Sequence, residues 1–164
     1  MIIETTRFGK VSVGENENIL MPQGMMGFPD LKQYCLIDPS DDTLIIWLQS
    51  LDEPAIAFPL LEPNIFRTAY TVRLTDNETR EIKLARMPDA VVYSVITIPE
   101  DVKEMTANLK APIVINTKEQ LAKQVVLQES EYSIKHLMFK ELRAHLATIQ
   151  AHAAKTTKTD AASV

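Results

Sequence analysis

The residues best suited to nucleophilic or metal chemistry are one cysteine and three histidines. Cys35 lies in the apolar run Tyr34–Ile37, where a free thiol packs as a small hydrophobe. A cysteine nucleophile needs a nearby imidazole, and the histidines, His136, His145 and His152, all lie in the C-terminal segment. His145 and His152 would share a helix face, but no Asp or Cys ligand accompanies them. These residues therefore predict neither a catalytic thiol nor a metal site.

Carboxylate pairs and glycines offer no clearer site. Asp41–Asp42 and Asp52–Glu53 stand at turns, where the local hydrogen bonding of acidic side chains explains them without general acid–base catalysis. The four glycines do not form a phosphate-binding loop, because Gly24–Gly27 does not lead into a predicted helix. We expect no enzyme activity and no cofactor.

Charge is unevenly divided along the chain. The 17 Lys and Arg and 22 Asp and Glu give a net charge of −5, and residues 140–164 hold four basic and two acidic residues. Residues 1–139 therefore hold 13 basic and 20 acidic residues, a net −7. Nucleic-acid affinity comes from neutralising phosphates with Lys and Arg, so we expect no direct nucleic-acid binding. An acidic body suits a basic protein partner, and a solvated acidic surface without a partner is the alternative.

Length and composition predict a soluble globular domain with its own core. The chain has 164 residues, of which 46% are hydrophobic and 24% charged. No apolar run approaches the roughly 20 residues of a membrane span, and the N-terminus lacks the features of a signal peptide. A single cysteine excludes an internal disulfide. We therefore expect a cytoplasmic protein with no membrane contact.

The secondary structure that positions the residues discussed above is predicted to be short strands. Each strand is a run rich in β-forming residues, and Pro, Gly, Asn and Asp separate the runs. Their close spacing leaves no room for crossover helices, which favours an antiparallel barrel or sandwich over a parallel sheet. Leu44–Leu48 and Val91–Ile96 are almost continuously apolar and are predicted as central strands covered on both faces. The expected strands are 2–6, 10–13, 18–21, 34–37, 44–51, 55–60, 69–74, 82–85, 91–98, 113–115 and 123–128.

An apolar stripe at helical spacing marks the end of the chain. It predicts a helix from about Ser133 to about Gln150, docked on the body by Leu137, Met138, Leu142 and Leu146, with residues beyond about 153 mobile. The helix could instead mediate self-association or wait for a partner helix. The stripe consists of Ile134, Leu137, Met138, Leu142, Leu146 and Ile149.

Three segments, in this order and spacing, resemble the FliW family of flagellar assembly factors. The first, Met21–Asp30, contains Met-Pro-Gln-Gly and Gly-Phe-Pro-Asp, and the second is Trp47–Phe58. The third, Met105–Asn116, is the most specific; it reads Met-Thr-Ala-Asn-Leu-Lys-Ala-Pro-Ile-Val-Ile-Asn and is followed by Lys-Gln-Val at 123–125. The resemblance covers roughly residues 1–139.

The resemblance implies a mainly β fold, a small, partly open antiparallel β-barrel with an added sheet. Residues 1–139 would form this FliW-like domain and residues 140–164 a C-terminal helical extension with a disordered end. The extension departs from the family, whose typical members end near residue 135, and we expect its removal to leave partner binding largely intact.

The resemblance also implies a non-catalytic protein with two partners. It would bind flagellin before export, and it would bind and antagonise CsrA, a small dimeric RNA-binding regulator, so that repression of flagellin translation is relieved. We expect a monomer. The alternatives are an acidic nucleic-acid mimic that inhibits another RNA-binding protein, and an enzyme whose site is not recognisable.

Candidate partner contacts are polar residues in or next to the family segments. Asn108 and Asn116 have a structural alternative, because asparagine amides cap turns. Leu109 is expected in the core, and Gly27 is expected to adopt a backbone angle closed to other residues. The candidates are Gln49, Asp52, Glu100, Asp101, Glu104, Thr106, Asn108 and Asn116.

Overall fold

The computed structural model describes residues 1–40, 44–128 and 131–162, and of helix residues 152–162 it describes the backbone only. Two α-helices, α1 (Asp76–Glu81) and α2 (Phe139–Ala162), accompany a predominantly β structure. Four 3-10 turns are η1 (Glu15–Glu17), η2 (Pro63–Ile65), η3 (Met87–Asp89) and η4 (Val102–Glu104). The strands are β1 (Ile2–Thr5), β2 (Gly9–Ser12), β3 (Ile19–Leu20), β4 (Gln33–Ile37), β5 (Ile46–Ser50), β6 (Ala57–Leu61), β7 (Ala90–Thr97), β8 (Thr106–Ala107), β9 (Ile113–Asn116), β10 (Leu121–Gln124) and β11 (His136–Leu137).

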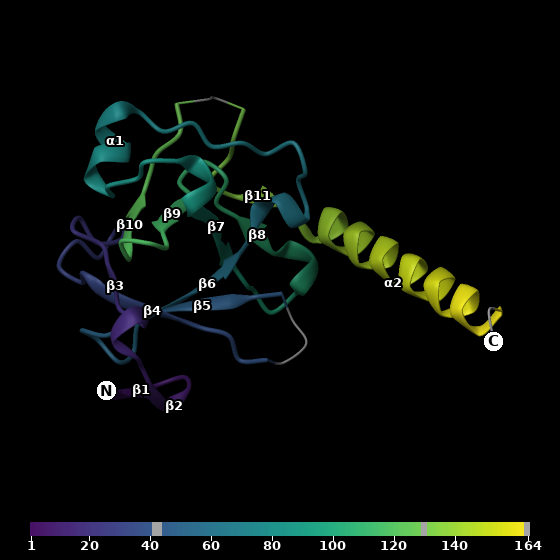
Figure 1. Cartoon of the computed structure of the whole chain (residues 1–164), viewed down its shortest axis with the longest axis horizontal. Coiled ribbons are helices and arrows are strands. Elements are labelled where there is room, and N and C mark those ends of the chain that lie inside the picture. Colours follow the sequence, from purple (N-terminus) through teal and green to yellow (C-terminus); the bar gives the residue numbers. More distant parts are fainter. Residues whose placement is uncertain (41–43, 129–130, 163–164) are drawn as a thin grey trace.

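The central feature is a closed ring of strands in the order β3-β4-β5-β6-β7-β9-β10 (Figure 1). Neighbours in the ring are antiparallel except β10 and β3, which pair in parallel through Leu121 and Leu20. The ring closes because β7 pairs with β6 near Ser94 and with β9 over Ala90–Tyr93. The predicted mainly β fold with a small barrel is confirmed, and the barrel is more complete than the partly open form that we expected.

Two smaller elements extend the barrel. The end of β7 continues past the ring to pair with β8, which pairs in turn with β11, and these three strands form the added sheet. The β1–β2 hairpin covers the outer face of β5, where Phe8 meets Trp47 edge-on at 5.7 Å and the Arg7 guanidinium lies 4.2 Å from the Trp47 ring centroid. Hence β5 is covered on both faces, as its apolar sequence predicts.

Two apolar cores lie on opposite sides of the barrel wall. The inner core takes a residue from every strand of the ring, including Tyr34, Leu48 and Ile113. The outer core lies between the wall and the segments 65–84, 125–128 and 131–138, and Leu109 and Met138 are fully buried in it. Strand β9 serves both, because Ile113 and Ile115 point inward and Val114 points outward.

Two predicted strands are absent, since residues 69–74 and 82–85 are loops. Tyr70, Ile82 and Leu84 are nevertheless buried in the outer core, and Val72 and Leu74 pack against it half-buried. Tyr70 is held there by its hydroxyl, which donates to the Leu109 carbonyl at 2.7 Å, and Ile82 is packed behind the turn that ends α1. Residues 71–74 alternate polar and apolar, and Val72 and Leu74 are the more buried members. The alternation predicts which side chains are shielded, but it does not show that the segment lacks a strand neighbour.

The C-terminal helix begins later and packs less than predicted. Residues 136–137 pair with β8 as strand β11, so α2 starts at Phe139, and it continues to Ala162. Met138 is buried and Leu142 packs on the outer core, but Leu137 is 65% exposed and Leu146 is 41% exposed. The predicted docking by Leu137 and Leu146 is therefore wrong, and α2 projects away from the barrel (Figure 1). The backbone of α2 also runs past the predicted helix end near Gln150. The predicted mobility of residues beyond about 153 stays a prediction.

None of the helices within the described residues is both long enough and apolar enough to cross a bilayer.

Candidate partner-binding surface

Asn116 ends strand β9 with its side chain buried. Its Nδ2 donates to the carbonyls of Ile82 and Lys83 at 2.9 and 3.0 Å, and its Oδ1 accepts from the amides of Lys118 and Glu119 at 3.1 and 3.3 Å. One amide therefore fastens the end of α1 to the β9–β10 hairpin. The structure places Asn116 in the scaffold, with no side-chain atom available to a partner.

Gln49 has the same role at the other side of the barrel. It is fully buried in β5, and its Nε2 lies within 3.0–3.2 Å of the carbonyls of Ser50, Pro54 and Ile56. These donations hold the turn between β5 and β6, which belongs to the second family segment. Gln49 is thus also a scaffold residue.

Asp52 and Asn108 are closer to the surface but also hold backbone. The Asp52 carboxylate accepts from the amides of Lys32 and Gln33 at 2.9 and 3.1 Å, which ties the chain entering β4 to the β5–β6 turn. The Asn108 Oδ1 accepts from the Ala111 amide at 2.9 Å and so forms the turn before Pro112. Turn formation accounts for both side chains.

Three of the predicted contacts form one exposed acidic group, which we call the acidic corner: Glu100, Asp101 and Glu104. Asp101 accepts from the Lys103 amide at 3.0 Å and starts η4, and no ion pair within the described residues involves any of the three. Val102, in the middle of the corner, is 49% exposed. Turn η4 contacts the start of α2, so the corner lies at the root of the projecting helix, and Thr106 follows, half-buried, in β8.

A second group of polar residues at the root of α2, Arg67, His136 and Glu141, was not predicted from the sequence. Arg67 Nη1 lies 3.3 Å from His136 Nε2, which lies 2.7 Å from a Glu141 carboxylate oxygen. The His136 ring also stacks on Phe66, with 6.1 Å between centroids. These contacts join the loop after η2 to β11 and to the first turn of α2. Residues 69 positions apart in sequence carry no local pattern that would pair them.

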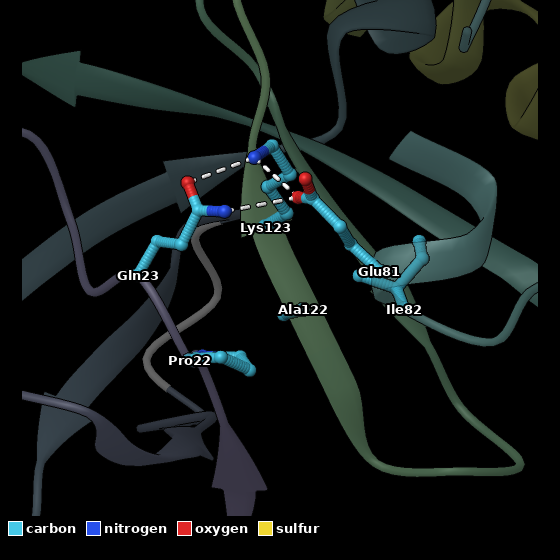
Figure 2. Close-up of a pocket in the computed structure, with 6 residues that line it drawn as sticks. All are labelled: Pro22, Gln23, Glu81, Ile82, Ala122 and Lys123. Carbon is cyan, nitrogen blue, oxygen red and sulfur yellow. Dashed lines mark hydrogen bonds and ion pairs between the residues drawn. The ribbon is translucent and has the colours of Figure 1, made fainter. Parts of the chain in front are cut away.

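The pocket in Figure 2 is filled by its own polar groups. Gln23, Glu81 and Lys123 converge there from the turn after β3, the end of α1 and strand β10. The Lys123 ammonium pairs with the Glu81 carboxylate and donates to Gln23 Oε1 at 2.9 Å, while Gln23 Nε2 donates to Glu81 at 3.1 Å. Its volume is about 100 Å³. With every titratable group already paired, the pocket ties elements together and offers no free acid or base.

The first family segment builds the neighbouring loop. Gly24 has a φ of +66° and packs so closely that a Cβ there would lie 2.5 Å from the Phe28 carbonyl oxygen, and Gly27 has the positive φ that we predicted, +86°. The turn places Met25 in the inner core and Phe28 edge-on against Phe58 at 5.5 Å. It closes one end of the barrel.

The buried thiol and phenols are poorly suited to nucleophilic chemistry. Burial, with a smaller contribution from Glu17, raises the pKa of the Cys35 thiol to about 11. Burial and the nearby Asp52 raise the pKa of Tyr34 to about 12. Both groups therefore stay protonated at neutral pH. Within residues 1–40, 44–128 and 131–162, no cluster of His, Cys, Asp and Glu could hold a metal ion.

A model of the FliW protein family matches residues 2–138, which is the whole barrel with its added sheet. The chain belongs to the FliW family. The flagellar assembly factor FliW of Bdellovibrio bacteriovorus is 40% identical over 159 residues, covering 97% of this chain and 91% of that protein. The corresponding protein of Alkaliphilus metalliredigens is 36% identical, covering 87% and 89%. A crystal structure of a flagellar assembly factor FliW superimposes with a TM-score of 0.79 at 34% identity, covering 85% of this chain and 97% of that one.

The matches cover different shares of this chain. The solved FliW is almost entirely matched yet leaves 15% of this chain unmatched, whereas the Bdellovibrio protein aligns with nearly the full length. The family model ends at residue 138, and the alignment with the Bdellovibrio protein continues well past it.

Proposed function

We propose that this flagellar assembly factor is a non-catalytic cytoplasmic protein that binds flagellin and that binds and antagonises CsrA, thereby relieving repression of flagellin translation. The observation that carries the proposal is the match of the whole barrel to the FliW family. The motifs that mark the family, however, hold the barrel together through Gly24, Gln49 and Asn116. Because these residues hold the barrel together, we expect exposed residues outside the motifs to contact the partners.

The acidic corner is the best-suited surface for CsrA. A regulator that binds RNA presents Lys and Arg to phosphates, and an exposed acidic group with free carboxylates is complementary to such a surface. Residues 1–139 carry a net charge of −7, so the long-range field favours the same partner. Glu100 and Glu104 are the residues that we expect CsrA to meet first.

The test measures capture of purified CsrA and purified flagellin by the full chain, and release of a flagellin leader RNA from CsrA. We expect both complexes and RNA release. The variant Glu100→Lys/Asp101→Lys/Glu104→Lys should lose CsrA capture and stay folded, with a melting temperature lowered only by the loss of the Asp101 cap on η4. Its matched control is Glu15→Lys/Asp30→Lys/Glu119→Lys, which reverses three exposed acids elsewhere.

The control separates location from total charge. Equal loss in both variants would mean that only net charge matters, and unchanged capture by the first would remove the corner from the binding surface. Failure of the unaltered chain to capture either partner would reject the proposed function.

A further inference from the structure

A groove at one end of the barrel runs between the loop 24–29 and the chain that leaves β10. Its volume is about 490 Å³, within the roughly 300–1,000 Å³ of binding clefts. Met26 and Val126 line it from its two sides, and these apolar side chains are 50% and 45% exposed. The groove therefore has an apolar lining that the described part of the chain leaves uncovered.

One wall of the groove is an unpaired strand edge. The ladder between β9 and β10 continues past Gln124, since Val125 and Leu127 donate to backbone carbonyls of the chain before β9 at 2.9 and 2.8 Å. Successive residues of an antiparallel strand turn their amides to opposite sides, so the amides of Gln124 and Val126 face away from β9. Within residues 1–40, 44–128 and 131–162, neither of these two N–H groups donates a hydrogen bond.

Pro22 explains why this edge has no neighbour. Leu20 of β3 donates to the Gln120 carbonyl at 2.9 Å, and in a parallel ladder the next donor on the same side of that chain would be residue 22. Proline has no N–H to donate, and the chain turns into the loop 24–29 instead. The Gln124 side chain spans the gap, where its Oε1 accepts from the Met26 amide at 2.9 Å. A free backbone edge beside a groove is suited to an extended peptide, which binds as an added strand.

Charge separates this groove from the acidic corner. The two charged residues that line it, Glu78 and Lys123, are of opposite sign. The Lys123 ammonium pairs with Glu81, and the Glu78 carboxylate accepts from the Thr75 amide at 2.8 Å in the cap of α1. A basic RNA-binding surface thus gains no advantage here, whereas an uncharged extended segment can pair with the edge and place an apolar side chain in the lining.

We infer that the groove binds an uncharged, extended segment of flagellin as an added strand along residues 124–126, apart from the CsrA contact at the acidic corner. The choice of flagellin rests on the proposed function, which gives the chain one basic partner and a second partner that the acidic corner does not explain. Strand β10 and the root of α2 lie on different sides of the barrel (Figure 1), so the two contact surfaces are separate.

The first test measures the affinity of the full chain for purified flagellin and for purified CsrA. Met26→Glu/Val126→Glu places two charges in the groove, and Ile2→Glu/Met87→Glu places them at exposed apolar positions elsewhere. Melting temperatures verify that both variants fold. We expect the groove variant to weaken flagellin binding by at least about tenfold and to leave CsrA binding within about twofold. The control variant should leave both affinities within about twofold.

Strand pairing has a readout of its own. Val126→Pro removes the N–H that faces the groove, whereas Val126→Thr keeps it beside a side chain of similar shape. We expect Val126→Pro to weaken flagellin binding by about threefold to tenfold and Val126→Thr to change it by less than about twofold. In the unaltered chain, hydrogen exchange at the amides of Gln124 and Val126 should slow by at least about tenfold when flagellin is added.

Unchanged flagellin affinity in the groove variant, with flagellin capture by the unaltered chain intact, would overturn the inference and leave the proposed function standing. Loss of CsrA binding in place of flagellin binding would also overturn it, as would unchanged exchange at both amides in the flagellin complex. An unaltered chain that captures neither partner would reject the proposed function, and the assignment of the groove to flagellin with it.

Discussion

The Nδ2 of Asn116 lies 2.9 Å from the carbonyl oxygen of Ile82, across 34 residues of sequence. The same amide group holds Lys83 and the first residues of the β9–β10 turn. Asn116→Ala would leave several buried backbone groups unpaired, and we expect it to lower the free energy of unfolding by about 2–4 kcal/mol. Urea denaturation measures this. Asn77→Ala removes an exposed amide bonded only to Glu81, and a loss as large as that of Asn116→Ala would contradict the scaffold role.

Leu109 and Asn108 are adjacent in the third family segment and should respond differently to truncation. Leu109→Ala empties a fully buried position in the outer core and should cost about 2–5 kcal/mol. Asn108→Ala removes one hydrogen bond from a half-buried turn and should cost about 1 kcal/mol. Denaturation midpoints measure both, and equal losses would show that the turn is as important as the core.

The Lys123–Glu81 pair should contribute more than a surface pair. Both side chains are mostly shielded from solvent, and Lys123→Met would leave the Glu81 carboxylate with only amide donors. We expect a loss of about 1–3 kcal/mol. The comparison is Lys118→Met, which breaks the pair between Asp89 and an ammonium group that is 71% exposed, and it should cost less than about 1 kcal/mol. A double-mutant cycle on each pair gives the two coupling energies, and similar values would refute the prediction.

Cys35 should make the protein less stable in alkali. Its folded pKa is about 11 against an ordinary 9.0, so the folded state holds the proton more tightly than the unfolded state does. The contribution is fully present below about pH 9 and is lost as the pH rises toward about 11. Cys35→Ala should flatten this part of the stability curve. A native thiol that reacts with Ellman's reagent at pH 8 as fast as the unfolded chain would show that Cys35 is not protected.

Much of the barrel could be predicted from local patterns, because burial on both faces leaves a continuous apolar run, as in Val91–Ile96 and Ile113–Ile115. The helix start could not. Residues 136–137 pair with β8, which lies 30 residues earlier, and that pairing overrides an apolar spacing that fits a helix equally well. The strand predictions for residues 69–74 and 82–85 were wrong for a related reason, since a packed loop and a half-buried strand bury the same side chains.

For the candidate site too, exposure could be predicted from the sequence, whereas hydrogen bonds between distant residues could not. The exposure of Glu100, Asp101 and Glu104 could be predicted from sequence, because charged residues without a buried partner stay at the surface; their contact with a partner stays a prediction. Gln49 and Asn116 were proposed as contacts because polar residues in a family motif suggest a surface. In the folded chain both side chains bond backbone groups that folding brings near, and a single sequence does not show these. The same holds for Arg67, His136 and Glu141 at the root of α2.

The closed ring also constrains when the protein can fold during its synthesis. Strands β3 and β7 find their last neighbours only in β10 and β9, so the ring cannot close until residue 124 has left the ribosome. Until then a nascent chain has two unpaired strand edges and an inner core without Ile113, Ile115 and Ala122, and such features promote aggregation. A message truncated before Ile113 would therefore yield an aggregation-prone fragment instead of a smaller working domain, and co-translational chaperones would meet this chain with most of its strands already made.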